Sequence, residues 1–206
     1  MSAPLFKADI LFTQRLLTVA GFYKGPRDGV WNAQCDTAEN DFDAETKRIT
    51  SVGRTFDPRS ETAIVTLLPV AQRKCRDFMT AAVRWPGGTI KILSGTRTYA
   101  EQNALFALGR TKAGKKVTNA RGGQSNHNFG IAWDIGIFVN GVYYTGATRE
   151  QEHAYDDLAN FIKLELDGLS WGGDWKSIKD KPHYQLVAGD DVAHCRECLE
   201  GGEAYV

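Results

Sequence analysis

The chain has 206 residues, a length that fits one domain or two small ones. Hydrophobic residues make up 42% and charged residues 24% of the sequence, a composition typical of globular proteins that excludes the disordered and fibrous classes. The 25 basic and 25 acidic residues cancel, so the sequence lacks the basic excess usual in nucleic-acid-binding proteins, and we expect no nucleic-acid partner.

Apolar residues recur at the spacing of helices in several segments, with turn signals between them. The predicted helices cover residues 5–20, 36–47, 60–83 with a break at Pro69, 98–110 and 148–166. Ser60 and Thr148 are the expected N-caps of the third and the last of these helices. The predicted strands cover residues 89–94, 131–139, 142–144, 169–171 and 183–187. Because Asn140-Gly141 is a hairpin signal and helices surround the strands, we predict an α+β fold with an antiparallel sheet.

A linker is predicted over residues 50–59, because this stretch contains Gly53 and Pro58 and few apolar residues. We therefore predict a small all-α domain over residues 1–55 and a larger α+β domain over 56–206. The first domain contains the motif Gln14-x-x-Leu17-x-x-x-Gly21-Phe22-Tyr23-x-Gly25-x-x-Asp28-Gly29-x-Trp31. With this motif, the domain resembles the small peptidoglycan-binding module that is fused to cell-wall hydrolases. The alternative is a helical extension that packs on the larger domain.

The chain has four cysteines, too few for a disulfide scaffold. Cys195 and Cys198 form a C-x-x-C sequence next to His194. A structural zinc site would need a second pair of ligands, and a redox motif would need a helix after it. We interpret the pair as structurally incidental, with a local disulfide as the alternative under oxidising conditions.

Three residues of the C-terminal half are of the types that bind a catalytic zinc ion. His127 precedes the strand predicted over 131–139, Asp134 lies within that strand, and His183 opens the last strand. Two imidazoles and one carboxylate leave the fourth position of a zinc ion to water. A single histidine or aspartate more often has a structural role, so the spacing and the sequence context carry this prediction.

The strand around Asp134 leaves room for an ion. Apolar residues occupy one face of the strand, and Asp134 shares the other face with Ala132 and Gly136, both of which are small. Asp180 lies three residues before His183, where it can take a proton from water as a general base.

The context of these residues resembles a known family. The signature S-x-H-x-x-G-x-A-x-D of the zinc D-Ala-D-Ala carboxypeptidase and L-alanyl-D-glutamate endopeptidase superfamily is present as Ser125-x-His127-x-x-Gly130-x-Ala132-x-Asp134. Residues 94–111, 117–127 and 171–183 are similar to the phage endolysin branch and stand in the order of that family. The resemblance covers about residues 60–187.

The resemblance implies the metal and the base. His127, Asp134 and His183 correspond to the zinc ligands, so the implied cofactor is Zn²⁺. Asp180 corresponds to the catalytic carboxylate, for which the endolysin branch has Asp where the carboxypeptidases usually have Glu.

The resemblance also implies residues that contact the substrate. Arg97 corresponds to an arginine that contacts the substrate or its developing negative charge, for which a planar guanidinium is suited; the alternative is a surface ion pair. Ser125 and Trp175 are candidate substrate contacts, with loop shaping and core packing as their respective alternatives. Asp174 is the expected hydrogen-bond partner of a ligand histidine.

The implied function is a zinc-dependent peptidoglycan hydrolase that cuts stem peptides, with the L-alanyl-D-glutamate bond as the expected target, in the manner of a modular endolysin. Within the superfamily, the alternatives are a D,D-carboxypeptidase and a secreted antibacterial effector that degrades the wall. A non-haem Fe(II) oxygenase also uses two histidines and a carboxylate, but its carboxylate commonly follows the first histidine by two residues rather than seven. The remaining alternative is a cell-wall-binding protein with an inactive metal site, against which the presence of Asp180 argues.

The expected partner is peptidoglycan, and we expect a monomer. No segment reaches the roughly 18 apolar residues of a membrane-spanning helix, so we expect no membrane insertion. The N-terminal residues lack a basic region followed by a continuous apolar stretch, so we expect no secretory signal. The expected location is therefore the cytoplasm at synthesis and the cell wall or periplasm after release or delivery.

Overall fold

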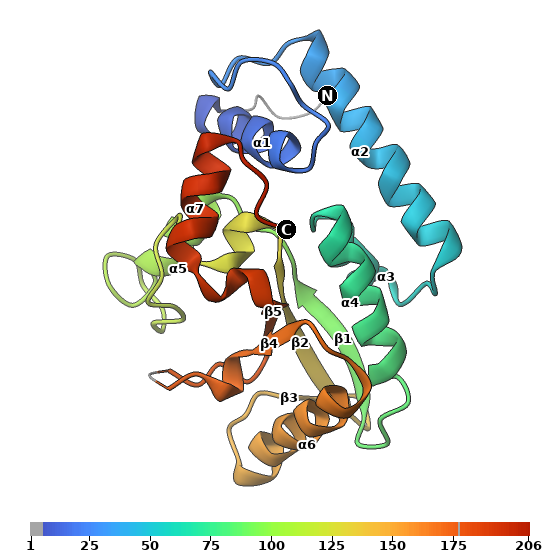
Figure 1. Cartoon of the computed structure of the whole chain (residues 1–206). Helices are drawn as coiled ribbons and strands as arrows, with labels where there is room; N and C mark the ends of the chain where they lie inside the picture. Colours follow the sequence, from blue (N-terminus) through green and yellow to red (C-terminus); the bar gives the residue numbers. More distant parts are fainter. Residues whose placement is uncertain (1–5, 177) are drawn as a thin grey trace.

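A computed structural model describes residues 6–176 and 178–206 of the chain (Figure 1). Its α-helices are α1 (Lys7–Val19), α2 (Ala33–Val52), α3 (Pro58–Ile64), α4 (Pro69–Ala82), α5 (Tyr99–Ala107), α6 (Arg149–Glu165) and α7 (Val192–Gly201). Its strands are β1 (Thr89–Ser94), β2 (Ala132–Val139), β3 (Val142–Tyr144), β4 (Leu169–Trp171) and β5 (His183–Leu186). Short 3-10 helices are η1 (Asn126–Phe129), η2 (Gly172–Asp174) and η3 (Val187–Asp190). The predicted α+β fold is thus confirmed.

The strands form one antiparallel sheet in the order β1-β2-β5-β4, and β3 forms a hairpin with β2. The hairpin turn has Asn140 and Gly141 at positive φ, as the sequence predicted. In the register of the sheet, Asp134 of β2 lies opposite Ser94 of β1 and opposite His183 of β5. The sheet itself therefore places two of the three predicted metal ligands side by side.

The main hydrophobic core lies between the sheet and the helices α4 and α6 (Figure 1). On β2 the predicted alternation is present, because Trp133, Ile135 and Ile137 are buried in this core. The ring of Phe78 on α4 lies 6.0 Å from the ring of Trp133 and 4.6 Å from the ring of Tyr184, measured between centroids. The apolar face of the sheet is thus covered, which leaves its other face for the polar residues of β2.

The start of α3 differs from the expectation. Asp57, and not Ser60, is the N-cap, and its side chain accepts a hydrogen bond from the Ser60 amide. Pro58 occupies the first turn, where its missing N–H costs no helical hydrogen bond, and this preference sets the helix start two residues earlier. The Ser60 hydroxyl instead accepts a hydrogen bond from the Ile92 amide of β1 at 2.9 Å. The break at Pro69 is confirmed, since α4 begins there.

The N-terminal helices have a small core of their own but also contact the larger one. Leu17, Tyr23, Cys35 and Ala38 form a separate hydrophobic cluster, whereas Phe12 and Val19 of α1 belong to the main core. On α2, the Thr46 hydroxyl accepts a hydrogen bond from the Gln72 side chain of α4 at 2.9 Å. Helix α2 continues to Val52, so the predicted linker is shorter than residues 50–59. The domain boundary at residue 55 stays a prediction.

All four cysteines are free and buried. Cys195 and Cys198 lie on α7 with their side chains in the main core, and no disulfide joins them. Among the residues that the structure describes, no helix combines the length and the apolar character needed to cross a membrane.

Candidate metal centre and active-site cleft

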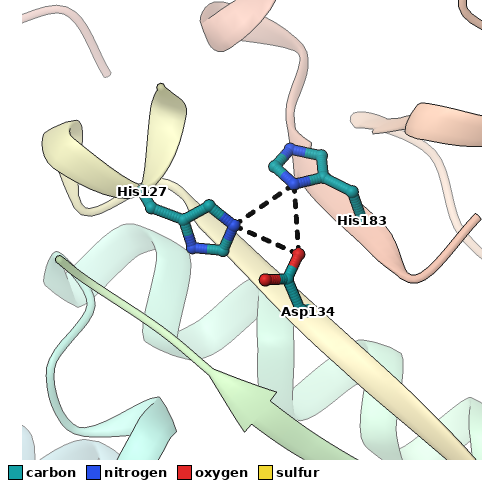
Figure 2. A group of neighbouring side chains, drawn as sticks. All are labelled: His127, Asp134 and His183. Carbon is teal, nitrogen blue, oxygen red and sulfur yellow. Dashed lines mark hydrogen bonds and ion pairs between the residues drawn. The ribbon is translucent and has the colours of Figure 1, made fainter. Parts of the chain in front are cut away.

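Three side chains from three elements converge at one place on the polar face of the sheet (Figure 2). His127 comes from η1, Asp134 from β2 and His183 from β5. The Nε2 atom of His127 lies 3.1 Å from Oδ1 of Asp134 and 3.2 Å from Nδ1 of His183. These three atoms form a triangle, and its third side, from His183 Nδ1 to Asp134 Oδ1, measures 3.3 Å. The structure therefore brings the three predicted ligands together with nearly equal spacings.

The turn between η1 and β2 delivers His127 to this place. Gly130 follows η1 in the left-handed conformation, with φ of +67°, which a residue with a side chain adopts only with strain. The Gly130 carbonyl accepts a hydrogen bond from the Leu68 amide at 2.9 Å, which ties the turn to the start of α4. The glycine of the sequence signature is thus required by the backbone.

The outer nitrogen of each imidazole has a partner that fixes its proton. Nδ1 of His127 lies 2.7 Å from the carbonyl oxygen of Gly95, which can only accept, so Nδ1 donates. Nε2 of His183 lies 3.0 Å from Oε1 of Gln185, while the Gln185 amide nitrogen donates to Asp190 Oδ1 at 2.9 Å. Both histidines therefore direct a nitrogen lone pair into the triangle. In metal sites, a hydrogen bond to the other ring nitrogen usually fixes a histidine ligand in this way.

The triangle fits a zinc ion. The lone pairs of two nitrogens and one carboxylate oxygen repel one another at this separation unless a cation or a proton lies between them. A tetrahedral zinc ion with bonds of about 2.0–2.1 Å holds its ligand atoms roughly 3.3 Å apart, close to the three measured sides. His127 and His183 are only 1% and 4% exposed, so water competes weakly for their nitrogens.

The electrostatics of the site favour the metal-binding form of His127 and Asp134 but hold a proton on His183 more strongly. Burial lowers the pKa of His127, which favours the neutral imidazole. Burial alone would raise the pKa of Asp134, but the charge of His127 and hydrogen bonds with both histidines hold it well below its usual range. For His183, the hydrogen bond and charge of Asp134 outweigh burial and raise the pKa. Of the two histidines, His183 therefore holds a second ring proton more readily than His127.

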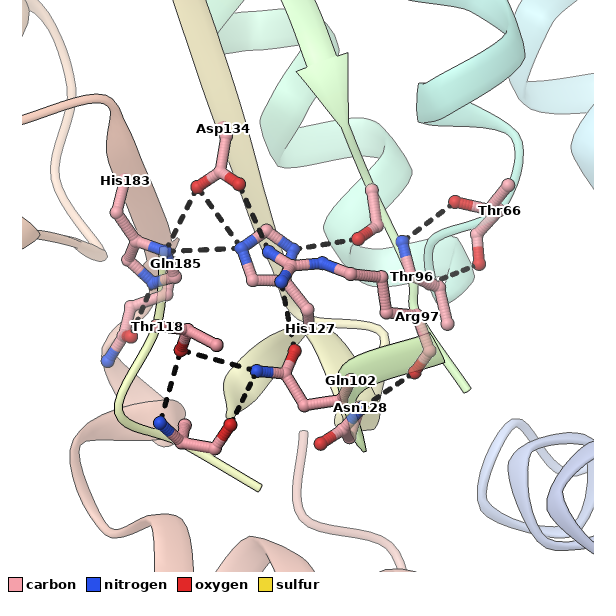
Figure 3. A network of polar contacts seen from close by, with 12 residues as sticks. Thr66, Thr96, Arg97, Gln102, Thr118, His127, Asn128, Asp134, His183 and Gln185 are labelled. Atoms are coloured by element: carbon pink, nitrogen blue, oxygen red, sulfur yellow. Dashed lines mark hydrogen bonds and ion pairs between the residues drawn. The ribbon is translucent and has the colours of Figure 1, made fainter. Parts of the chain in front are cut away.

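Arg97 lies beside the triangle and contacts the ligand carboxylate (Figure 3). Its Nη2 atom lies 3.1 Å from Oδ2 of Asp134, the oxygen that is not part of the triangle. Its Nη1 atom donates to the side chain of Gln102 at 2.9 Å, and its backbone amide donates to the His127 carbonyl at 3.0 Å. The guanidinium is thus held beside the candidate metal site, and its contact with Asp134 was not predictable from the sequence.

An open cleft of about 1160 Å³ contains the triangle. Its lining includes every residue predicted for the site: Arg97, Ser125, His127, Asp134, Trp175, Asp180 and His183. Asp180 is half-buried, and burial followed by the nearby charge of Asp134 raises the pKa of its carboxyl group. The cleft therefore holds a candidate base and a candidate metal site together.

A tight turn sets the position of Asp180. The Asp180 amide donates to the Gly172 carbonyl at 3.0 Å, and the His183 amide donates to the Asp180 carbonyl at 3.1 Å. A Cβ atom on Gly172 would lie 2.3 Å from the Asp180 carbonyl oxygen, so only glycine permits this approach. One glycine thus couples the candidate base to the ligand His183.

Trp175 and Asp174 occupy different surroundings. The half-buried ring of Trp175 lies 4.9 Å from the ring of His183, between centroids, so it packs on a ligand and faces the cleft. The expectation that Asp174 partners a ligand histidine is wrong, because Asp174 is exposed and pairs with Lys163 at 2.7 Å. The partner of His183 is Gln185, which sequence reasoning missed. The spacing of two residues on one strand was the available signal, since such residues share a face.

The chain is similar to one family model and to two proteins of known activity. Residues 118–186 match the family model described as D-alanyl-D-alanine carboxypeptidase. The peptidoglycan L-alanyl-D-glutamate endopeptidase CwlK of Bacillus subtilis is 34% identical over 128 residues, which are 59% of this chain and 74% of that protein. The crystal structure of the L-Ala D-Glu endopeptidase ChiX of Serratia marcescens matches with 24% identity and a TM-score of 0.46, over 69% of this chain and 97% of that one.

The matched residues 118–186 contain His127, Asp134, Asp180 and His183, so the family match includes the site itself. The resemblance of the S-x-H-x-x-G-x-A-x-D motif to the carboxypeptidase and endopeptidase superfamily is confirmed. With a relative of this identity aligned over most of its own length, the chain belongs to the D-alanyl-D-alanine carboxypeptidase family of metallopeptidases.

Proposed function

We propose that this protein is a zinc-dependent endopeptidase that cuts the L-alanyl-D-glutamate bond of peptidoglycan stem peptides. The observation that carries the proposal is the convergence of His127 Nε2, Asp134 Oδ1 and His183 Nδ1 in a cleft that also holds Asp180. The choice of bond is supported by the relative CwlK, whose name gives that specificity, and by the Asp at position 180.

Zinc is the proposed metal because of the donor set. Two imidazole nitrogens and one carboxylate oxygen form a usual ligand set of catalytic zinc, with one position left open. When bound at such a site, zinc polarises a carbonyl group and lowers the pKa of water.

Asp180 is the proposed general base and acid. It takes a proton from the attacking water and returns it to the amine that leaves, so that the peptide bond is hydrolysed with no net proton change at the enzyme. Its half-buried position and its raised pKa both suit a group that must accept and then release a proton.

Arg97 has two proposed tasks. It orients Asp134 through Oδ2, and its fixed positive charge stabilises negative charge that develops on the substrate carbonyl oxygen. Ser125 and Trp175 are proposed substrate contacts, because both are half-buried in the lining of the cleft.

We propose further that the protein acts at the cell wall as a lysis enzyme of the endolysin type. The similarity of residues 94–111, 117–127 and 171–183 to the phage endolysin branch supports this assignment. The helices α1 and α2, with their own small hydrophobic cluster, are the proposed wall-binding region.

Digestion of purified sacculi, with mass spectrometry of the released fragments, tests the proposal. We expect stem peptides that begin with D-glutamate, with L-alanine left on the muramic acid. Release of free D-alanine with the L-alanyl-D-glutamate bond intact would assign the protein to the carboxypeptidases instead. Binding to sacculi without any released peptide, by protein that holds zinc, would indicate a wall-binding protein.

A further inference from the structure

The charges of the chain are unevenly distributed, although their total is zero. Residues 102–133 contain five Lys or Arg residues and no Asp or Glu. The five cations lie within a single loop after α5, at Arg110, Lys112, Lys115, Lys116 and Arg121. The rest of the chain therefore has an acidic excess of the same size. We call residues 105–121 the basic wall.

The basic wall borders the active-site cleft. Leu105, Leu108, Val117, Thr118 and Ala120 line the cleft from this segment. The wall is held to α5, since the Gln102 side chain donates to the Ala120 carbonyl at 2.9 Å (Figure 3) and Asn103 accepts from the Gly122 amide at 2.9 Å. The five cations thus belong to a segment that lines the cleft, although their own side chains are not part of the lining.

Two of these cations make cation–π contacts with the same aromatic ring. The guanidinium carbon of Arg110 lies 3.8 Å from the centroid of the Phe106 ring, and that of Arg121 lies 4.8 Å from it. Arg110 also donates to Asn119 Oδ1 at 2.9 Å, which is a neutral acceptor. In the described part of the chain, no carboxylate oxygen lies within 4.0 Å of any of the five cations. Two guanidinium groups held together without an acidic partner suit an anionic ligand.

Residues of the segment 169–183 also line the cleft, and two lysines of this region are paired with carboxylates. Lys163 pairs with Asp174 at 2.7 Å, and Lys181 pairs with Asp156 at 2.9 Å. The ammonium group of Lys179 donates to the Gly173 carbonyl at 2.7 Å. Among the described residues of this segment, Lys176 and Lys179 have no carboxylate partner, so it carries fewer uncompensated cations than the basic wall with its five.

In the proposed substrate, the two sides of the bond that is cut also differ in charge. In a stem peptide, L-alanine is acylated and carries no charge, whereas D-glutamate and the residues after it carry carboxylates. We propose that the basic wall binds the carboxylate-bearing C-terminal side of the stem peptide and so sets the direction in which the substrate lies in the cleft. This inference rests on the proposed function, and it makes the free α-carboxylate of D-glutamate a specificity determinant.

Two soluble peptides that contain the L-alanyl-D-glutamate bond test the inference, one with the α-carboxylate of D-glutamate free and one with that group as a carboxamide. The zinc-loaded protein should cleave the first with a kcat/KM about tenfold higher, and added salt should reduce the difference, because exposed charges are screened. Arg110→Gln/Arg121→Gln should remove most of this preference by lowering kcat/KM on the carboxylate peptide about tenfold, with less than a twofold change on the carboxamide.

Matched variants separate charge from structure. Lys115→Gln/Lys116→Gln, at two exposed positions, should lower the preference without a change in melting temperature, and Arg110→Lys/Arg121→Lys should keep part of it. Lys176→Gln, which removes a charge in the segment 169–183, should leave the preference unchanged. Equal cleavage of both peptides by the unaltered protein would overturn the inference.

Other outcomes would also overturn it. Equal loss on both peptides in the arginine double variant would indicate a structural role for the wall. A loss of binding to intact walls with an unchanged peptide preference would indicate a phosphate polymer as the ligand. If neither peptide is cut at the L-alanyl-D-glutamate bond, the proposed function itself fails, and that result is distinct from cleavage without preference.

Discussion

Gln185 should influence zinc affinity, although it is not one of the three candidate ligands. Its Oε1 atom accepts from His183 Nε2 at 3.0 Å and from the Asn126 side chain at 2.6 Å, while its amide nitrogen is committed to Asp190. Replacement of Gln185 by Leu leaves the buried Nε2–H of His183 without an acceptor. This favours the tautomer with the proton on Nδ1, the atom that faces the metal. Loss of such a partner typically weakens metal binding 10–100-fold, which corresponds to about 1.4–2.7 kcal/mol.

Zinc dissociation constants, measured by competition with a chelator of known affinity, would test this expectation. Gln72→Leu is a matched control, because Gln72 is equally buried and hydrogen-bonded to Thr46 and to the Leu67 carbonyl. That variant should lower the melting temperature and leave zinc affinity unchanged. Zinc affinity of Gln185→Leu within twofold of the unaltered protein would refute the reasoning.

A charge-swapped pair tests the same contact from the other direction. Gln185→Glu retains an acceptor for His183 but brings a second carboxylate against Asp190, so it should destabilise the fold while keeping zinc affinity. Adding Asp190→Asn restores a donor to the new carboxylate and should recover the melting temperature.

Three further outcomes follow from the site. His127→Ala should lose zinc and activity together, whereas Asp180→Asn should keep zinc, measured by metal analysis, and lose at least about 100-fold in kcat. Because the pKa of His183 is raised and that of His127 is lowered, zinc must displace one proton, from His183. The zinc dissociation constant should therefore rise about tenfold per pH unit below the pKa of His183 and level off above it; a slope of two protons would contradict this assignment. Gly172→Ala, whose Cβ would clash with the Asp180 carbonyl, should displace the turn and lower both activity and, by about 1–3 kcal/mol, the free energy of unfolding measured in urea.

Local patterns in the sequence were sufficient to predict the strands, whereas the candidate ligands also required the resemblance to a family signature. On β2 the alternation of apolar and polar residues is a property of the strand itself, so it assigned Trp133 to the core and Asp134 to the other face. Gly130 likewise carries a local requirement for positive φ. The start of α3 was predicted wrongly because two capping signals competed, and the one at Asp57-Pro58 was stronger than Ser60.

Contacts between distant segments were not predictable in the same way. The ion pair between Arg97 and Asp134 depends on how the end of β1 lies against β2, and the partnership of His183 with Asn126 through Gln185 depends on how η1 lies against β5. The pairing of Asp174 with Lys163 depends on the position of α6. Such arrangements follow from tertiary packing, about which residue types alone give little information.

The packing that stabilises the sheet also sets the geometry of the metal site. Trp133 lies opposite Tyr184 in the β2–β5 register, and Phe78 of α4 packs on both rings. Because side chains alternate along a strand, this register necessarily places Asp134 opposite His183 on the other face. A slip of one residue would turn the aromatic residue toward the cleft and His183 toward the core. The apolar contacts therefore oppose the same displacement that would separate the candidate ligands. This explains how β5, a strand of only four residues, can hold His183 Nδ1 at 3.3 Å from Asp134 Oδ1.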